Sequence, residues 1–512
     1  MAVNKVRIVD ERRFVQATRD SGYRDLDAAV SELVDNALQA NARTVRIVTP
    51  LGKHPQGSWS LAVLDDGSGM TRHELGTALQ FGGSHRFNDR TGLGRFGMGL
   101  PNSSLSQARR VDVYSWMRRG AVWHSYLDLD EILFGHCRHV PMPARAALPE
   151  AFRAHAQVTG TLVLWSRFDR LCSSSGASAI RRLELRLGQR FRYFIWGGHR
   201  ILINDVPVVP FDPLFLSGET RVPCVRGKQY GDTLVYGLAT VGGEDGARTA
   251  RVQVRFSEIP VPELAGLTKE QKRLYGISSG AGVSIVRAGR EIDYGWFFMD
   301  KRRENYDDWW RCEVSFAPEL DELFGVAHTK QGIRPSDRLR SLLTPQLGSI
   351  ARLLNRRARR AHMTYAAQNG RESASVASKR DGRLRPTVHG NSALGGVAAC
   401  KGQLPGRQAV PEAGLRQYAV EMQDIHERVF YRAEAKDGNV VLVLNNLHEF
   451  AQRLYSPLVA GDTSDGLAVK FQLFLLALAR SENLNWTDSE RDTIQRFKHE
   501  WSRAVSVFLR GA

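Results

Sequence analysis

Two polar side chains, Glu32 and Asn36, lie four residues apart in a segment whose apolar residues recur at helical spacing. That spacing places a carboxylate and an amide on one helix face, where both can reach one ligand. A carboxylate can activate a water molecule, and an amide oxygen can bind a hard cation such as Mg2+. An amphipathic helix with a solvated glutamate has the same pattern, so the pair alone leaves both interpretations open.

A second polar group, Asp65, follows a stretch from Trp59 to Leu64 that is typical of a strand. Gly67 and Gly69 come directly after it, and glycines allow a backbone to approach a ligand closely. The same residues also suit an ordinary Asp-Gly turn. The motif therefore indicates a binding loop at a strand end only in combination with other motifs.

A third motif is the glycine-rich stretch from Gly92 to Leu100. Backbone N–H groups at the start of a helix form a site for anions, and glycines expose such groups. No Gly-Lys-Ser/Thr sequence follows, so the stretch is not a Walker A loop. The preceding residues 81–90 are polar and contain glycine, which is typical of a mobile lid.

In their order and spacing the three motifs resemble the ATP site of the GHKL superfamily, which contains gyrase, the ninety-kilodalton heat-shock chaperones, histidine kinases and MutL. The resemblance implies ATP and Mg2+ as cofactors, with Glu32 as general base and Asn36 as the Mg2+ ligand. It also implies that Asp65 accepts a hydrogen bond from the adenine amino group, and that Thr161 helps to bind adenine through a water. The other residues that it assigns to the nucleotide are Gly67, Gly69, Met70, Gly92, Gly94, Phe96, Gly97 and Gly99.

One position departs from the pattern of several relatives, which carry a lysine just after the last glycine where this chain has Leu100. Further along, Thr329-Lys330-Gln331 resembles the transducer loop of type II topoisomerases, MutL and the microrchidia (MORC) ATPases. The resemblance implies that Lys330 reaches the γ-phosphate and takes part in catalysis, since a lysine is a point charge on a flexible stem. A single lysine is otherwise most often a solvated surface charge. The loop also separates the chain from histidine kinases.

These motifs need a sheet and helices to position them, and the spacing of strands and helices predicts an α/β sandwich with helices on one face. The resemblance implies a Bergerat-type ATP-binding domain and a transducer-like (S5-like) α/β domain that ends in a basic helix. Beyond it, the strand and helix patterns of the chain predict a small C-terminal α/β unit for interaction or dimerisation. A Gly-, Ser- and Pro-rich segment between the last two reads as a disordered linker. The four predicted segments are residues 1–198, 199–365, 366–414 and 415–512.

The composition of the chain favours certain kinds of binding partner and cellular compartment over others. The chain has 512 residues and a formal net charge of +17, which favours a polyanion such as DNA, although a generally basic proteome gives the same excess. The basic run from Arg356 to Arg360 either follows a phosphate backbone or is a solvated helix end. Five scattered cysteines without a CxxC pair are typical of a reducing cytoplasm. No signal peptide or membrane-spanning run is expected.

Together these features predict a Mg2+-dependent ATPase that acts as a clamp on DNA and forms a homodimer when ATP binds. Two alternatives remain open. One is a chaperone of the heat-shock type with a protein client, and the other is an ATP-binding switch without significant turnover. Salt-sensitive DNA binding would separate the clamp from the chaperone, and turnover would separate it from the switch.

Overall fold

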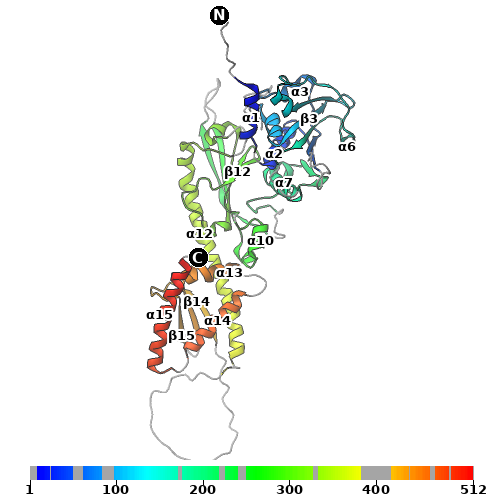
Figure 1. Ribbon diagram of the computed structural model, residues 1–512. Helices are drawn as coiled ribbons and strands as arrows, with labels where there is room; N and C mark the ends of the chain where they lie inside the picture. The colour runs from blue at the N-terminus through cyan, green and yellow to red at the C-terminus, as the bar shows by residue number, and fades with distance from the viewer. Residues whose placement is uncertain are drawn as a thin grey trace, which may run out of the picture. The chain divides into compact units, whose positions relative to one another are not determined.

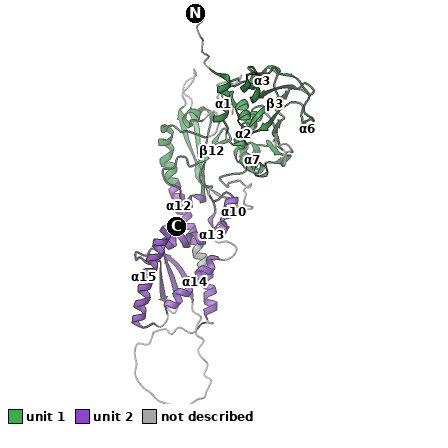
Figure 2. Cartoon of the chain, in the orientation of Figure 1, with its two compact units in different colours: residues 1–258, 281–302, 310–350 green, residues 259–280, 303–309, 351–512 purple. Residues whose placement is uncertain are grey.

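The computed structural model divides the chain into two compact units (Figure 2). One comprises residues 1–258, 281–302 and 310–350, and the other comprises residues 259–280, 303–309 and 351–512. The structure describes residues 9–23, 25–49, 61–83, 97–170, 176–217, 225–239, 249–278, 280–326, 332–381, 384, 417–436, 439–461, 467–483 and 486–510.

The first unit contains an eight-stranded sheet with the order β5-β4-β3-β6-β2-β1-β7-β8. Neighbouring strands run antiparallel except for β1 and β7, which are parallel. The strands are β1 (Thr44–Val48), β2 (Leu61–Asp65), β3 (Ala108–Trp116), β4 (Trp123–Asp128), β5 (Ala144–Arg145), β6 (Gly160–Phe168), β7 (Arg200–Ile203) and β8 (Val206–Pro207).

One face of this sheet is covered by helices, of which α2 and α7 are labelled in Figure 1. Alternate strand residues point to opposite faces, so Leu61 and Val63 join the large core under the helices, whereas Ala62 and Leu64 join a smaller cluster behind the sheet. The helices of this part are α1 (Glu11–Ser21), α2 (Leu26–Gln39), α3 (Arg72–Ala78), α4 (Gly99–Gln107), α5 (Leu129–Phe134), α6 (Glu150–Arg153), α7 (Gly176–Arg190) and α8 (Arg192–Trp196). The predicted α/β sandwich is confirmed, with the addition that α6 packs Phe152 into the cluster behind the sheet.

The turn between β7 and β8 is formed by residue types that favour its backbone conformation. Asn204 and Asp205 both have positive φ, 49° and 65°, which two-residue hairpins of the primed type require and which Asn and Asp tolerate well. Ile203 pairs with Val206 across this turn. The residue preferences of this dipeptide therefore account for the turn.

A second sheet in the same unit has the order β12-β11-β13-β10-β9. Its strands are β9 (Lys228–Ala239), β10 (Thr249–Glu258), β11 (Val283–Arg287), β12 (Arg290–Gly295) and β13 (Trp310–Phe316), and it is followed by η2 (Pro318–Leu320) and α11 (Asp321–Phe324). Strand β12 was not predicted, and it is the strand that lies against α7 and α8. Its buried Glu291 binds Arg192 at 3.0 Å and Gln189 at 2.7 Å, which joins this sheet to the helices of the first one.

The long helix α12 (Asp337–Asp381) has 45 residues. It continues through 366–381, which the sequence analysis assigned to the start of a linker. Ala374 of this stretch packs into an apolar core, and that burial explains why a stretch with weak helical periodicity is helical. The rest of the predicted linker lies outside the described residues, apart from Leu384.

The second unit contains a three-stranded sheet with the order β14-β16-β15, and α14 and α15 are labelled beside it in Figure 1. Its elements are α9 (Val261–Leu264), α10 (Lys269–Leu274), η1 (Asn305–Trp309), β14 (Tyr418–Gln423), β15 (Tyr431–Lys436), β16 (Asn439–Asn445), the π-helix η3 (Phe450–Tyr455), α13 (Ser456–Gly461), α14 (Leu467–Glu482) and α15 (Asp488–Arg510). Among the helices of the described residues, none has both the length and the apolar character needed to span a membrane.

Candidate active site

Helix α2 carries the two side chains from which the sequence analysis began. Glu32 is 4% exposed and Asn36 is partly exposed one turn later. The helix buries almost all of its other residues, so its position is fixed on every side by packing. The result is a shielded carboxylate beside an amide that a ligand can reach.

The start of helix α4 approaches Glu32 so closely that only glycine fits there. A Cβ atom at Gly99 would overlap the carboxylate of Glu32. Within the described residues no side chain caps this helix at Met98, so the backbone N–H groups of Gly99 and Leu100 can donate to an anion. The geometry therefore brings a carboxylate next to a helix N-terminus, which are the two groups needed around a phosphate and its attacking water.

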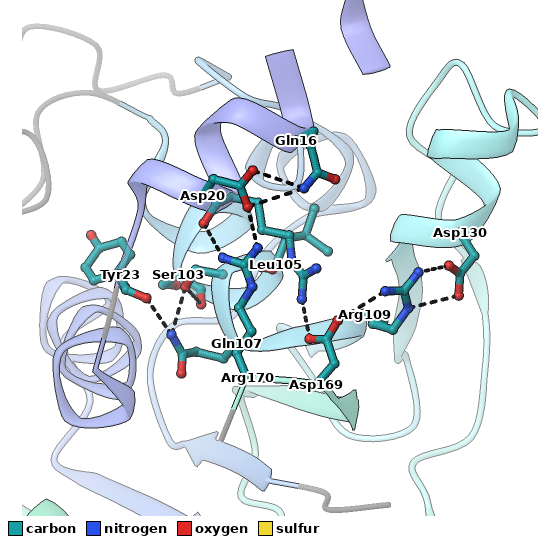
Figure 3. Close-up of polar contacts among 12 residues, drawn as sticks. Gln16, Asp20, Tyr23, Ser103, Leu105, Gln107, Arg109, Asp130, Asp169 and Arg170 are labelled. Carbon is teal, nitrogen blue, oxygen red and sulfur yellow. Dashed lines mark hydrogen bonds and ion pairs between the residues drawn. The ribbon is translucent and has the colours of Figure 1, made fainter. Parts of the chain in front are cut away.

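Polar contacts tie the last turn of α1, and Tyr23 just after it, to α4 (Figure 3). Arg19 Nε donates to the carbonyl oxygen of Leu105 at 2.6 Å, and the same guanidinium pairs with Asp169. Gln107 Nε2 donates to the carbonyl oxygen of Tyr23 at 2.6 Å. These contacts hold the segment between α1 and α2 in place.

Tyr23, which is held by this network, is a site residue that sequence reasoning missed. Its phenol is buried and interacts electrostatically with the Glu32 carboxylate. Burial and the charge of Glu32 raise the pKa of Tyr23 well above its ordinary value, so the phenol stays protonated and can donate. No pattern in the sequence marks this tyrosine, because it precedes the helix and meets Glu32 only in the fold.

Asp65 ends strand β2, as predicted. Its Oδ1 atom accepts the backbone N–H of Gly67 at 2.9 Å. Burial raises the pKa of Asp65 to about 7, although hydrogen bonds from the backbone of Gly67 and Thr161 act in the opposite direction. A ligand that donates a hydrogen bond to the ionised form of such a carboxyl stabilises that form against the effect of burial.

Thr161 lies directly opposite Asp65 in the pairing of β2 with β6. Its hydroxyl is 2.9 Å from Ser115 Oγ, and Ser115 in turn accepts the backbone N–H of Met70 at 2.8 Å. Gly69 has a φ of 71°, and a Cβ there would overlap the carbonyl of Trp116. The structure thus gathers the predicted Asp65, Gly67, Gly69, Met70 and Thr161 around the ends of three strands. Ser115, which links them, was not predicted.

The glycine-rich stretch is described only at its end. Gly97 has a φ of 63°, and its carbonyl oxygen accepts the N–H of Gly82 at 3.1 Å, which joins the two ends of the predicted lid. The predicted residues Gly92, Gly94, Phe96 and Lys330 lie outside the described residues. Their roles stay predictions.

The residues that are described fit a nucleotide with its cation. Within the described ranges, no three His, Cys, Asp or Glu side chains converge as a cation cage. Mg2+ in nucleotide sites keeps several waters and takes few protein ligands besides phosphate oxygens, and the partly exposed Asn36 can be such a ligand. Gly99 lets the start of α4, where phosphates would bind, come close to Glu32.

Comparison with known proteins identifies this part of the chain. Residues 23–157 match the family described as histidine kinase-, DNA gyrase B- and HSP90-like ATPase. Over 134 residues, 25% of this chain, the sequence is 28% identical to ATPase MORC2 of Homo sapiens and to ATPase MORC2A of Mus musculus. Over 81 residues, 16% of this chain, it is 35% identical to MORC family CW-type zinc finger protein 1 of Homo sapiens.

These matches cover 12% of the length of the two MORC2 relatives and 8% of the third. The matched family range contains Glu32, Asn36, Asp65 and Gly99, and it ends before Thr161. The resemblance to the GHKL superfamily, and within it to the MORC ATPases, is confirmed for this domain.

Proposed function

Because residues 23–157 form an ATPase domain of the GHKL type, similar to that of the MORC ATPases, we propose that the chain binds ATP with Mg2+ and hydrolyses it. The observation that carries the proposal is the approach of the α4 start to Glu32, which only Gly99 permits. It leaves a shielded carboxylate beside free backbone N–H groups, with Asn36 one turn away on the same helix.

In this proposal Glu32 accepts the proton of the attacking water. The phenol of Tyr23 holds one oxygen of the carboxylate and leaves the rest of the group to orient the water. Asn36 binds Mg2+, and the N–H groups at the start of α4 bind phosphate oxygens. ATP would supply the phosphoanhydride bond, and its bound cation would neutralise the negative charge of the phosphates. The protein therefore contributes mainly positioning and electrostatics.

The adenine half of the site is built on the strand ends. Asp65 accepts a hydrogen bond from the adenine amino group, and the Thr161 hydroxyl contributes through a water. The direct pairing of Asp65 with Thr161 supports this assignment, because it places the two side chains next to each other at the ends of neighbouring strands. Gly67 and Gly69 let the following loop approach the base.

The phosphate charge needs partners beyond these groups, because Leu100 stands where several relatives have a lysine. We assign that role to Gly92, Gly94, Phe96, Gly97 and Lys330. Support for Lys330 comes from the resemblance of its loop to transducer loops.

We further propose that ATP binding drives two copies together and that the dimer closes around DNA. The net charge of +17 supports a polyanionic partner. So does helix α12, whose residues Arg356, Arg357, Arg359 and Arg360 are all exposed. A chaperone with a protein client and a switch without turnover are the competing functions.

The proposal is tested by ATP turnover of the wild type, Glu32→Ala and Lys330→Ala, with and without duplex DNA. Matched controls are Glu150→Ala and Lys269→Ala, which change exposed residues of the same types outside the site. We expect turnover to be lost in both site variants, retained in both controls and stimulated by DNA. Loss in Glu32→Ala alone would remove Lys330 from the mechanism, and no turnover in the wild type would favour the switch.

A further inference from the structure

A cavity of about 380 Å³ lies in the first unit, and none of the residues assigned above to the nucleotide lines it. It is bounded by the start of α2, by α7 and by β12 of the second sheet. Its size is that of a small-ligand pocket and is too small for a folded partner. The lining residues are Asp25, Asp27, Ala28, Arg182, Arg186, Arg190, Arg290, Glu291, Ile292, Asp293, Tyr294 and Gly332.

Arginines dominate the side chains that remain without partners. Arg182, Arg186 and Arg190 are spaced by one helical turn each along α7, so they share a face. Arg182 and Arg186 are exposed and have no ion-pair partner among the described residues. Arg290 is only 3% exposed, and its Nη1 atom has no hydrogen-bond partner within the part of the chain that the structure describes.

The acidic residues of the cavity are mostly engaged elsewhere. Asp27 pairs with Arg190 at 2.9 Å, and Glu291 is bound by Arg192. Asp293 accepts the backbone N–H groups of Ile333 at 3.0 Å and of Tyr294 at 2.8 Å. Arg290 pairs with Asp35, so the uncommitted positive charge of the cavity is that of Arg182 and Arg186. Among the described lining residues, the exposed Asp25 is the remaining carboxylate that can oppose it.

The start of α2 adds to this positive character. The residue before the helix, Asp25, makes no side-chain hydrogen bond to the first helical N–H groups. These groups and the positive end of the helix dipole therefore face the cavity that Asp25, Asp27 and Ala28 line. A buried guanidinium N–H without a partner calls for an ion or water that completes it.

We propose that this cavity is a second ligand site, which binds a compact anion carrying two or more phosphate groups. Arginine suits phosphate because its planar fork donates two parallel hydrogen bonds. Arg182 and Arg186 on α7 and Arg290 on β12 can together reach more than one phosphate. A single phosphate would leave part of the cavity empty. This site does not depend on ATP hydrolysis and goes beyond the function proposed above.

The position of the cavity links its occupancy to the ATPase helix. Ala28 precedes Glu32 by one helical turn on α2. Arg290 Nε lies 2.8 Å from Asp35 Oδ1, and Asp35 is the neighbour of Asn36 in the chain. An anion held by Arg186 and Arg290 would therefore tie β12 to the helix that carries the proposed base and cation ligand, and would regulate turnover.

The direct test is calorimetric titration of the full chain with tripolyphosphate. The nucleotide site is first saturated with a non-hydrolysable ATP analogue, and both solutions contain the same Mg2+ concentration. We expect one tripolyphosphate per chain. Arg186→Gln should weaken binding about tenfold, and Arg182→Gln with Arg186→Gln should weaken it further, because each loses charge-assisted hydrogen bonds to phosphate. Both residues are exposed, so these variants keep the fold.

The control is Arg338→Gln, which changes an exposed arginine of α12. Binding that is unaffected by the α7 variants, or that disappears when the ATP analogue is present, would overturn the proposal. Equal competition by sulfate would show a general anion site, and equal competition by duplex DNA would show a nucleic-acid surface. Either result would contradict a site for a compact oligophosphate, and none of these results depends on whether the chain hydrolyses ATP.

Discussion

At the scale of single residues, the ionisation of Asp65 gives the proposed adenine contact a pH dependence. The pKa of this carboxyl is raised to about 7 by burial, and the ionised form accepts a hydrogen bond from the adenine amino group more strongly than the neutral acid does. Binding therefore weakens as the pH falls through the pKa, by at most about tenfold per pH unit below it. We expect the dissociation constant for ADP to rise by up to about tenfold between pH 8 and pH 6.

Protonation of the phosphates contributes in the same pH range, and the variant Asp65→Asn separates the two effects. This variant should bind ADP more weakly at pH 8 and should keep only the pH dependence of the phosphates. Equilibrium titration at four pH values measures both proteins. Identical pH profiles for wild type and Asp65→Asn would contradict the assignment of Asp65.

Replacement of Tyr23 tests whether its phenol orients the Glu32 carboxylate for catalysis. Tyr23→Phe keeps the buried ring and removes the O–H that we propose to orient Glu32. A hydrogen bond to a charged group is worth roughly 1.5–3 kcal/mol, so we expect kcat to fall by about tenfold or more. KM for ATP should change less than twofold, because Tyr23 positions the base and does not touch the nucleotide in our proposal.

The matched control for Tyr23 is Tyr275→Phe, at the end of α10 in the second unit, which should leave both constants unchanged. Steady-state kinetics at saturating and limiting ATP distinguish the two effects. A Tyr23→Phe enzyme with the kcat of the wild type would show that Glu32 needs no orientation by the phenol.

At the scale of elements, the contact between α2 and α4 explains why the glycine-rich stretch has a glycine at position 99. Gly99→Ala places a methyl group where the Glu32 carboxylate lies, so either the helix start or the carboxylate must move. Because positioning supplies most of the proposed rate enhancement, we expect turnover to fall at least about tenfold. Thermal unfolding and circular dichroism would show whether the fold is retained.

Gly76→Ala in α3 is the control for this substitution. A Cβ at Gly76 meets only Pro143, at 3.6 Å, which is an ordinary contact. Alanine also favours a helix over glycine, so this variant should be at least as stable as the wild type and equally active. Full activity of Gly99→Ala would mean that the close approach has no part in catalysis.

The sequence predicted the parts of the fold and site that follow from local chemistry. Strand β2 ending at Asp65, the helix under Glu32 and the Asn204-Asp205 turn all have local causes, namely apolar periodicity and turn preference. Strand β12 was missed because its polar residues are buried by partners distant in the chain, as in the pairing of Arg290 with Asp35. Such partners exist only after folding.

The same reasoning applies to the site. Glu32 and Asp65 belong to motifs with fixed spacing, so they could be chosen as candidate site residues from the sequence. Tyr23 and Ser115 belong to no motif and enter the site because α1 is tied to α4 and β3 pairs with β6. Helix α12 continued past its predicted end for a related reason, since the burial of Ala374 outweighs a weakly helical composition.

At the scale of the whole molecule, the positive charge of +17 makes any binding to DNA dependent on salt. Each protein cation that meets a phosphate releases counterions, so the logarithm of the affinity falls with the logarithm of the salt concentration by about 0.9 per contact on a duplex. We expect DNA affinity to fall steeply between 50 mM and 200 mM salt, and to be higher with a non-hydrolysable ATP analogue than without it.

Replacement of Arg356 and Arg360 by glutamine tests whether the exposed basic face of α12 provides some of these contacts. The salt slope should become shallower by about 0.9 for each phosphate contact removed, and the loss should be the same for unrelated DNA sequences, because phosphate contacts carry no sequence information. Fluorescence anisotropy with a labelled duplex measures the slope, and a pair of exposed arginines outside α12, Arg119 and Arg251, provides the control. An unchanged slope would remove α12 from the DNA interface. No binding of the wild type at 50 mM salt would contradict the DNA clamp and favour a protein client, because electrostatic attraction is strongest under that condition.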